Sequence, residues 1–307
     1  MDATSTCPSY SARDYKSEVK PVWCPGCGDY SVLGALTKAL AELSIPPENV
    51  ALVSGIGCSS RLPAYTNVFG FHGVHGRALP IATGIKVSRP ELTVIASGGD
   101  GDGFSIGGNH FMHACRRNVD MTYIVMDNEV YGMTKGQASP TTAPDWEKSK
   151  LTPQGTGINP FHPLVIALAA GANFIARGFS GDPNGAAQLI TEAIRHPGFS
   201  FVQLLSPCVT FRPEQRDWKD AVHPAAVDPT DDPARAARRL MTDDGFNIGV
   251  LYRGKRAPFL PVRKASVDSV AALEQAFLLG QAWSPGERLH SPESPPPAVR
   301  AADPLPA

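Results

Sequence analysis

Six cysteines carry the most informative chemistry of this sequence, and two of them form a closely spaced pair. The pair lies in Trp23-Cys24-Pro25-Gly26-Cys27, and thiolates three residues apart can bind one metal ion or one iron-sulfur cluster. Cys58 and Cys208 each follow an apolar run, and Cys58 also stands in a glycine-rich turn. In a chain without a secretory signal, these cysteines favour metal binding or redox chemistry over a disulfide framework.

Such a pair could belong to an iron-sulfur cluster, a redox site or a zinc site, and the residues alone leave these three possibilities open. A redox pair of the thioredoxin type, here with Pro and Gly reversed, would need a strand before Trp23, where no convincing strand is found. A zinc site would need two more ligands, most simply a second CxxC, which the sequence lacks. Cys58 and Cys208 are ligand candidates if both reach one edge of the fold, and buried core cysteines otherwise. We expect Cys7 and Cys115 to be structural or incidental thiols.

Oxygen ligands for a hard cation follow two further apolar runs. Asp100 lies in the glycine-rich segment Gly98–Gly103, where backbone N–H groups can approach phosphate oxygens ahead of a predicted helix. Asn128 lies 28 residues later, after the next apolar run. Mg²⁺ prefers such oxygen ligands, combined with phosphate oxygens of a bound substrate. Each segment alone is equally compatible with a tight turn, because Gly and Asp are ordinary turn residues.

An alternation of strands and helices must position these residues. Short apolar runs rich in β-branched residues predict strands, and amphipathic stretches predict the helices between them. The predicted strands are Val50–Ser54, Leu92–Ser97, Met121–Met126, Asn173–Arg177 and Ser200–Leu205, and the predicted helices are Tyr30–Leu43, Arg77–Ser88, Ile106–Arg117, Pro163–Ala170, Gly185–Arg195 and Pro233–Met241. We expect an α/β fold with a doubly wound, mostly parallel sheet that binds ligands at the carboxyl ends of its strands.

The remaining sequence suggests an arm, an extension and a tail around this domain. We expect an N-terminal arm at residues 1–22, the cofactor-binding domain at 23–209, a small C-terminal extension at 210–283 and a mobile proline-rich tail at 284–307. The tail has seven prolines in 24 residues and no aromatic residue, too little apolar area to offset the entropy of ordering. Inside the domain, Thr134–Phe161 lacks periodicity and predicts a long loop, a candidate substrate lid.

Charge and hydropathy exclude several classes of function. The 28 basic and 29 acidic residues give a formal net charge of −1, with no run of like charges that could follow a nucleic-acid backbone. The longest apolar run, Leu164–Ala172, is roughly half of the ~20 residues that span a bilayer. Residues 1–23 contain no apolar segment typical of a signal peptide. We expect a cytoplasmic protein that binds neither nucleic acid nor membranes.

The joint spacing of Asp100 and Asn128 resembles the diphosphate-binding motif of thiamine-diphosphate enzymes. This resemblance implies that Asp100, Asn128 and the carbonyl of Val130 bind Mg²⁺. It also implies four residues that line the diphosphate, namely Gly101, Asp102, Gly132 and Met133.

A longer resemblance, from about Val22 to Cys208, is to the β subunits of 2-oxoacid:ferredoxin oxidoreductases. The motifs that carry it are Trp23-Cys24-Pro25-Gly26-Cys27-Gly28, Gly55-Ile56-Gly57-Cys58-Ser59, His75-Gly76-Arg77, Tyr131–Gln137 and Ser206-Pro207-Cys208. In that family the four matching cysteines ligate a [4Fe-4S] cluster, which implies this role for Cys24, Cys27, Cys58 and Cys208. The resemblance further implies cofactor contacts for Ile56, Gly57, Cys58, Ser59 and His75, and catalytic roles for His75 and Lys135.

The family implies oxidative decarboxylation of a 2-oxoacid with coenzyme A, with electrons passing through the cluster to ferredoxin. The motifs resemble the 2-oxoglutarate type more than the pyruvate type, and a distal carboxylate would require a cation, for which Arg61, Arg77 and Lys135 are candidates. Each of these three side chains could equally be an ordinary surface charge without a role in substrate binding. An α subunit, or α plus γ, would supply the domain that holds the aminopyrimidine ring.

Other functions remain open from the sequence. One is the same reaction with pyruvate or a broad range of 2-oxoacids. A non-redox thiamine-diphosphate decarboxylase subunit would keep Asp100 and Asn128 but would have no use for four cysteines. A zinc-binding structural subunit would use the cysteines without thiamine.

Overall fold

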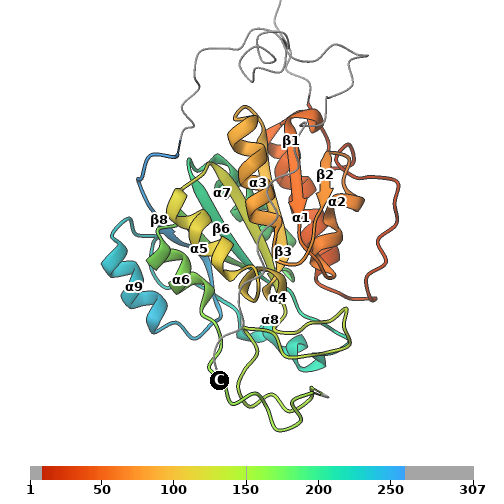
Figure 1. Ribbon diagram of the computed structural model, residues 1–307, viewed down its shortest axis with the longest axis vertical. Coiled ribbons are helices and arrows are strands. Elements are labelled where there is room, and N and C mark those ends of the chain that lie inside the picture. The colour runs from red at the N-terminus through yellow and green to blue at the C-terminus, as the bar shows by residue number, and fades with distance from the viewer. Residues whose placement is uncertain (1–8, 150, 260–307) are drawn as a thin grey trace, which may run out of the picture. The chain divides into compact units, whose positions relative to one another are not determined.

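The structure is a computed structural model, and it describes residues 9–149 and 151–259 (Figure 1). These residues belong to one compact unit built on an eight-stranded sheet with the order β2-β1-β3-β4-β6-β5-β8-β7. The strands are β1 (Val50–Ser54), β2 (Phe69–His72), β3 (Thr93–Gly99), β4 (Met121–Asp127), β5 (Phe174–Phe179), β6 (Phe199–Leu205), β7 (His223–Pro224) and β8 (Asn247–Arg253). The six strands from β1 to β6 run parallel, whereas β8 pairs antiparallel with β5.

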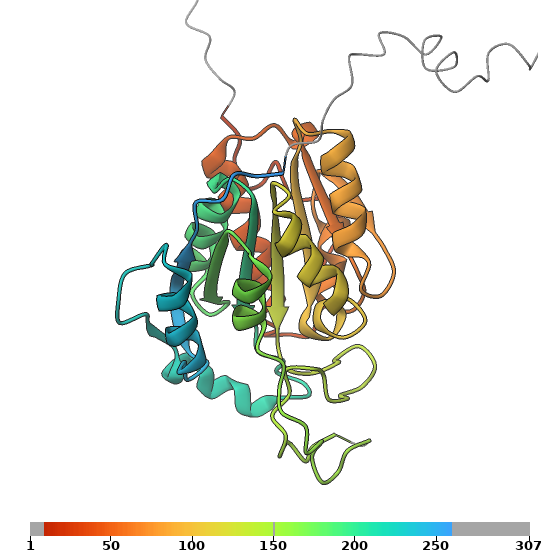
Figure 2. The same ribbon diagram turned by 60° about the vertical axis from the view of Figure 1, so that its left-hand side comes forward.

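Helices cover both faces of the sheet (Figures 1 and 2). The α-helices are α1 (Asp29–Leu43), α2 (Leu62–Tyr65), α3 (Ala78–Ser88), α4 (Asp100–Phe104), α5 (Gly108–Arg117), α6 (Pro163–Ala170), α7 (Pro183–Arg195), α8 (Trp218–Ala221) and α9 (Pro233–Met241). Side chains of α3, α5, α6 and α9 pack on one face, and those of α1 and α7 pack on the other. Neighbouring residues of β1 point to opposite faces, so this apolar strand contributes side chains to the hydrophobic core on each face of the sheet.

Local sequence explains where several helices begin and end. The carboxylate of Asp182 accepts a hydrogen bond from the N–H of Gly185 and caps α7, and Asp232 caps α9 in the same way. Asn118 adopts a left-handed conformation that ends α5, and Gly171 does so at the end of α6. These ends leave short connections to the strands that follow.

The chain order creates a crevice between β1 and β3. The connection from β1 leads outward to β2, whereas the connection from β3 leads to β4 on the opposite side. In sheets of this kind, ligands bind at the carboxyl ends of the strands where the direction reverses. The segments that begin at Gly55 and Asp100 therefore meet at this crevice.

The doubly wound, mostly parallel sheet expected from the sequence is confirmed, with some differences in detail. Asp100–Phe104 forms a helical turn where a glycine-rich turn was expected. The pattern also missed β2, whose residues are all exposed, and β8, which lies beyond the predicted core domain. The strand β8 completes hydrogen bonds along β5, so part of the expected extension belongs to the sheet. The expected tail, like Cys7, lies outside the described residues.

The long loop expected over Thr134–Phe161 follows β4. In the described part of the chain, no helix or strand lies between Asp127 and Pro163. The loop projects beyond the carboxyl ends of the strands (Figure 2). It is therefore on the side of the sheet where the topology predicts a ligand.

Candidate functional site

A pocket of about 260 Å³ opens at the carboxyl ends of β1, β3 and β4. It is lined by Ile56, Gly57, Cys58, Ser59, Gly99, Asp100, Gly101, Asp102, Met126, Asn128, Val130, Tyr131, Gly132, Met133 and Thr134. Eleven of these residues are ones for which the sequence predicts a contact with the cofactor or its metal ion. Three separate loops converge here because parallel strands present their carboxyl ends to the same edge.

Asp100 and Asp127 are two buried carboxylates that share one hydroxyl group. The Oγ1 atom of Thr141 lies 3.0 Å from Oδ2 of Asp100 and 2.9 Å from Oδ1 of Asp127. A hydroxyl has one hydrogen and cannot donate a full hydrogen bond to both carboxylates at once. Burial, and then the neighbouring charge of Asp127, raises the pKa of Asp100 to about 8. The pair is short of positive charge, and a divalent cation bound to Asp100 would supply it.

The backbone between the two other expected metal ligands adopts a strained conformation. Glu129 has a φ of +53° and lies between Asn128 and Val130. Its carbonyl oxygen accepts hydrogen bonds from the hydroxyl of Thr142 at 2.6 Å and from the guanidinium of Arg212 at 2.9 Å. The side-chain oxygen of Asn128 accepts a hydrogen bond from the N–H of Val130 at 3.1 Å. Strained conformations persist where surrounding contacts hold them, and they concentrate at functional sites.

The second acid of the glycine-rich segment holds the neighbouring loops together. The Oδ1 atom of Asp102 accepts hydrogen bonds from the N–H groups of Gly76 at 2.7 Å and Ile56 at 3.1 Å. The same oxygen lies 3.2 Å from Nδ1 of His75. The other oxygen, Oδ2, is buried and has no hydrogen-bond partner among the described residues. Asp102 thus connects His75 to the loop after β1 at the edge of the pocket.

Three chain segments bring four cysteines to the same end of the sheet. The indole N–H of Trp23 donates a hydrogen bond of 2.8 Å to the carbonyl of Cys58, which joins the segment Cys24–Cys27 to the loop after β1. A Cβ atom on Gly132 would lie 3.9 Å from Sγ of Cys58 and 3.8 Å from Sγ of Cys208. Gly132 lines the pocket, so these two thiols lie directly beside it.

Electrostatic interactions link the same four thiols. Burial raises the pKa of Cys58 to about 11, with further contributions from Asp29, Cys208 and Cys24. Burial and Asp29 also raise the pKa of Cys27, with smaller contributions from the neighbouring thiols. Cysteine binds iron as the thiolate, so positive charge from bound iron would be needed to offset this clustering of negative charge.

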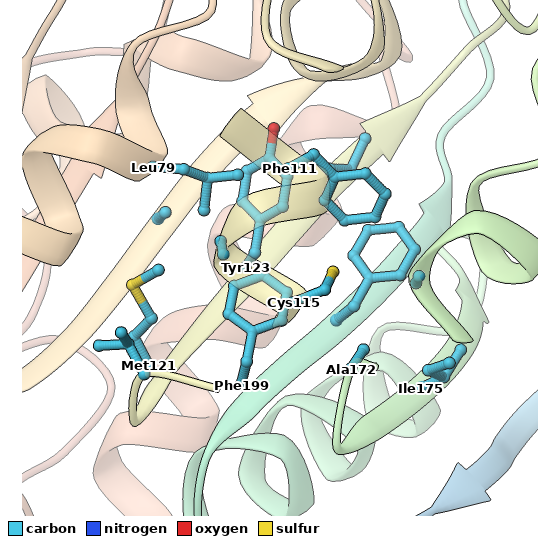
Figure 3. Close-up of a cluster of buried hydrophobic side chains, with 14 of the residues drawn as sticks. Leu79, Phe111, Cys115, Met121, Tyr123, Ala172, Ile175 and Phe199 are labelled. Atoms are coloured by element: carbon cyan, nitrogen blue, oxygen red, sulfur yellow. The ribbon is translucent and has the colours of Figure 1, made fainter. Parts of the chain in front are cut away.

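The donor set fits an iron-sulfur cluster, in which each thiolate binds a different iron atom. Within residues 9–149 and 151–259, no three His, Cys, Asp or Glu side chains are arranged to hold a single metal ion. Cys115 lies elsewhere, fully buried among apolar side chains between α5 and the sheet (Figure 3). Its environment matches the structural thiol expected from the sequence.

The three candidate cations for substrate do not line the pocket. Arg61 donates a hydrogen bond of 2.8 Å from Nε to the hydroxyl of Tyr65, and Arg77 donates one of 3.3 Å to the carbonyl of His75. Lys135 is exposed, next to the lining residue Thr134, and has a φ of +83°. The ammonium of Lys135 is the one most available to a ligand at the pocket mouth, since neither a hydrogen bond nor an ion pair of its side chain is found in the described structure.

Sequence reasoning missed several residues of this site. Tyr131 lines the pocket and donates a hydrogen bond of 2.8 Å to the carbonyl of Gly101. Asp127 immediately precedes the predicted ligand Asn128, and an acidic residue next to a predicted metal ligand indicates a second site residue. Thr141 lies in an aperiodic loop, where nothing in the sequence marked it.

Among the described residues, no helix has the length and apolar composition required to cross a bilayer.

Comparison with known proteins places these features in a family context. Residues 55–204 match the model of the thiamine pyrophosphate enzyme C-terminal TPP-binding domain. Subunit beta of 2-oxoacid:ferredoxin oxidoreductase 2 from Aeropyrum pernix is 42% identical over 254 residues, which cover 78% of this chain and 82% of the relative. The 2-oxoglutarate oxidoreductase subunit KorB of Mycobacterium tuberculosis is 45% identical over 199 residues, 65% of this chain and 53% of the relative.

A solved structure shows the same relationship in three dimensions. The 2-oxoglutarate:ferredoxin oxidoreductase from Magnetococcus marinus, with 2-oxoglutarate, coenzyme A and succinyl-CoA bound, is 40% identical and matches with a TM-score of 0.79. The match covers 92% of this chain and 95% of the matched chain.

Proposed function

Because this chain belongs to the family of 2-oxoacid:ferredoxin oxidoreductase β subunits, we propose that it oxidatively decarboxylates 2-oxoglutarate with coenzyme A, as part of a larger enzyme. The products would be succinyl-CoA and CO₂, and the electrons would pass through a [4Fe-4S] cluster to ferredoxin. The choice of 2-oxoglutarate is supported by the names of the Mycobacterium and Magnetococcus relatives.

The main support for this proposal is that the pocket and the cysteine site have residues in common. Cys58 and Gly132 both line the pocket, and Gly132 also lies next to the thiols of Cys58 and Cys208. A cofactor in the pocket would therefore lie beside a cluster held by the cysteines. Non-redox thiamine enzymes need no electron acceptor at that position, so this arrangement favours the oxidoreductase over the decarboxylase alternative.

We assign thiamine diphosphate to the pocket through its diphosphate and Mg²⁺. Asp100, the side chain of Asn128 and the carbonyl of Val130 would hold the metal ion. Gly101, Asp102, Gly132 and Met133 would lie along the diphosphate. Glycine is required at position 101 because a Cβ atom there would lie 2.3 Å from the ring of Tyr131.

The chemistry supplied by the cofactors is nucleophilic addition to the keto carbon, acceptance of the electron pair left by CO₂, and one-electron transfer. The side chains of this protein would orient the substrate and supply the charged groups around it. We assign a proton-transfer role to His75, whose ring is held by Asp102 and lies edge-on to Tyr131. Lys135 would attract an anionic group of the substrate or coenzyme A, and Arg61 and Arg77 are further candidates for the distal carboxylate.

The proposed enzyme requires partner chains. Its relatives are named as β subunits, which implies an α subunit. We propose that α, or α plus γ, holds the aminopyrimidine half of thiamine and that ferredoxin collects the electrons in the cytoplasm.

The test is to co-express the chain with the products of neighbouring genes and assay the purified complex anaerobically. Each 2-oxoacid is supplied with coenzyme A and a low-potential acceptor, and 2-oxoglutarate should give the highest kcat/KM. Equal constants for pyruvate would instead indicate broad specificity, which the general name of the Aeropyrum relative also allows. Turnover without acceptor reduction would indicate a non-redox enzyme, and zinc in place of iron and sulfide would indicate a structural subunit.

A further inference from the structure

The segment that follows Cys208 also contacts the loop that carries Asn128. Two buried side chains of this segment, Arg212 and Gln215, make these contacts. We propose that Gln215 and Arg212 are positioning residues that couple the cluster site to the thiamine-diphosphate site, so that binding at one site strengthens binding at the other. This inference rests on the proposed function, since it concerns the two cofactors assigned above.

Gln215 connects the two sites with a single side chain. It is 1% exposed. Its Nε2 atom donates a hydrogen bond of 2.8 Å to the carbonyl of Asn128, and its Oε1 atom accepts one of 2.9 Å from the N–H of Cys208. The donor group therefore holds an expected metal ligand while the acceptor holds an expected cluster ligand. A buried amide that loses either contact is left unsatisfied, which makes both contacts costly to break.

Arg212 provides a second connection, parallel to the first. Its backbone N–H donates a hydrogen bond of 2.9 Å to the carbonyl of Cys208. Its guanidinium contacts both the carbonyl of Glu129, at 2.9 Å, and the carboxylate of the same residue, at 3.0 Å. The guanidinium also lies 4.6 Å from the ring centre of Trp146, which keeps it in place. The strained residue between the two metal ligands is thus held by the segment that carries the cluster ligand.

Through these contacts, a ligand that rigidifies one site should also rigidify the other. When Cys208 binds the cluster, the segment through Gln215 is fixed at one end, and the carbonyl of Asn128 is fixed with it. Thiamine diphosphate then binds a loop that is already ordered and loses less conformational entropy. Because such coupling is reciprocal, bound thiamine diphosphate should also make the cluster harder to lose.

The experiment measures this coupling in the assembled complex. The affinity for thiamine diphosphate with Mg²⁺ is determined by calorimetry, once with the cluster reconstituted and once after iron has been removed by a chelator. In the wild-type complex the cluster should tighten binding by about fivefold or more. In the complex with Gln215→Met, which fills a similar volume without the two amide contacts, the ratio of the two affinities should fall markedly, and the part that remains is carried by Arg212. The matched control is Gln188→Met on α7, an exposed glutamine whose side chain contacts Glu192, and it should retain the wild-type ratio.

A merely structural role for Gln215 would lower the melting temperature and leave the ratio of affinities unchanged, and that result would overturn the inference. If Gln215→Met does not fold, Arg212→Lys provides the test, because a single ammonium group cannot keep both guanidinium contacts with Glu129. An unchanged ratio in that variant would be equally decisive against the coupling. A wild-type complex that binds no iron or no thiamine diphosphate would instead refute the proposed function. A wild-type complex that binds both without any coupling would refute this inference alone.

Discussion

The carboxylate of Asp102 occupies the space that a side chain on Gly55 would fill. A Cβ atom at Gly55 would lie 1.8 Å from Oδ2 of Asp102, far inside van der Waals contact. We predict that Gly55→Ala displaces this carboxylate, breaks its contacts with His75 and Ile56, and lowers the affinity for thiamine diphosphate by roughly tenfold or more. Calorimetric titration of the variant checks this.

The control for that substitution is Gly34→Ala in α1, where an added Cβ meets no atom within 4 Å. Alanine has the higher helix propensity, so this variant should be more stable by about 0.5–1 kcal/mol and should bind the cofactor normally. Equal cofactor affinity in both variants would contradict the role given to Gly55.

Asp100→Asn should separate cofactor binding from stability. The amide is a poorer Mg²⁺ ligand than the carboxylate. Loss of a residue that only supports a metal ligand lowers metal affinity about 10- to 100-fold, so loss of this direct ligand should weaken cofactor binding by about a hundredfold or more. The cofactor-free protein should unfold at the same or a higher denaturant concentration, because the amide is neutral in both the folded and the unfolded chain and avoids the cost that the raised pKa of Asp100 reflects. Calorimetry and urea denaturation measure the two effects. Retained affinity would remove Asp100 from the metal site.

The cysteines should divide into two groups by iron content. Replacement of Cys24, Cys27, Cys58 or Cys208 by Ala should each abolish the cluster and acceptor reduction. Cys115→Ala should keep a full complement of iron and lose about 1 kcal/mol of stability, because it removes an atom from the apolar cluster in Figure 3. Iron and sulfide are counted in all five variants. Full iron content in the Cys58 or Cys208 variant would refute the four-cysteine site.

Lys135 combines a charge near the pocket with an unfavourable backbone conformation. Lys135→Ala and Lys135→Gly should both reduce kcat/KM for the oxoacid or coenzyme A by roughly ten- to hundredfold, because each removes the ammonium group. Lys135→Gly should be the more stable of the two by about 1 kcal/mol, because glycine adopts a φ of +83° without strain. Steady-state kinetics and thermal denaturation separate these effects. Unchanged kinetic constants would leave Lys135 an ordinary surface residue.

The pH dependence of stability should contain a contribution from His196. Its Nε2 atom is buried without a hydrogen-bond partner in the described chain, and burial, with Arg253 next, lowers the pKa of His196 below its ordinary value of 6.5. Between the folded-state pKa and pH 6.5 the unfolded chain therefore binds a proton that the folded chain does not. The contribution to stability is complete above that pH and is lost as the pH falls toward the folded-state pKa.

His196→Gln should flatten this part of the profile. The measurement is the urea midpoint of both proteins between about pH 5 and pH 8. A profile for the variant that runs parallel to the wild type would show that His196 does not contribute.

The amino-acid sequence determined the parts of this protein that depend on local pattern. Apolar runs and amphipathic periods are set by neighbouring residues, so they located β1, β3, β4, β5 and β6 to within a few positions. Parallel strands share one carboxyl edge, and for that reason motifs far apart in the chain were correctly expected to meet there. Eleven predicted residues line the resulting pocket.

The tertiary structure decided how the two proposed cofactor sites are held together. Gln215 contacts the carbonyl of Asn128 across 87 positions of sequence, and Arg212 contacts Glu129 across 83. Thr141 bridges two carboxylates from an aperiodic loop. None of these contacts leaves a periodic signal, because each depends on which surfaces the folded backbone brings together and on the need of buried polar groups for a partner.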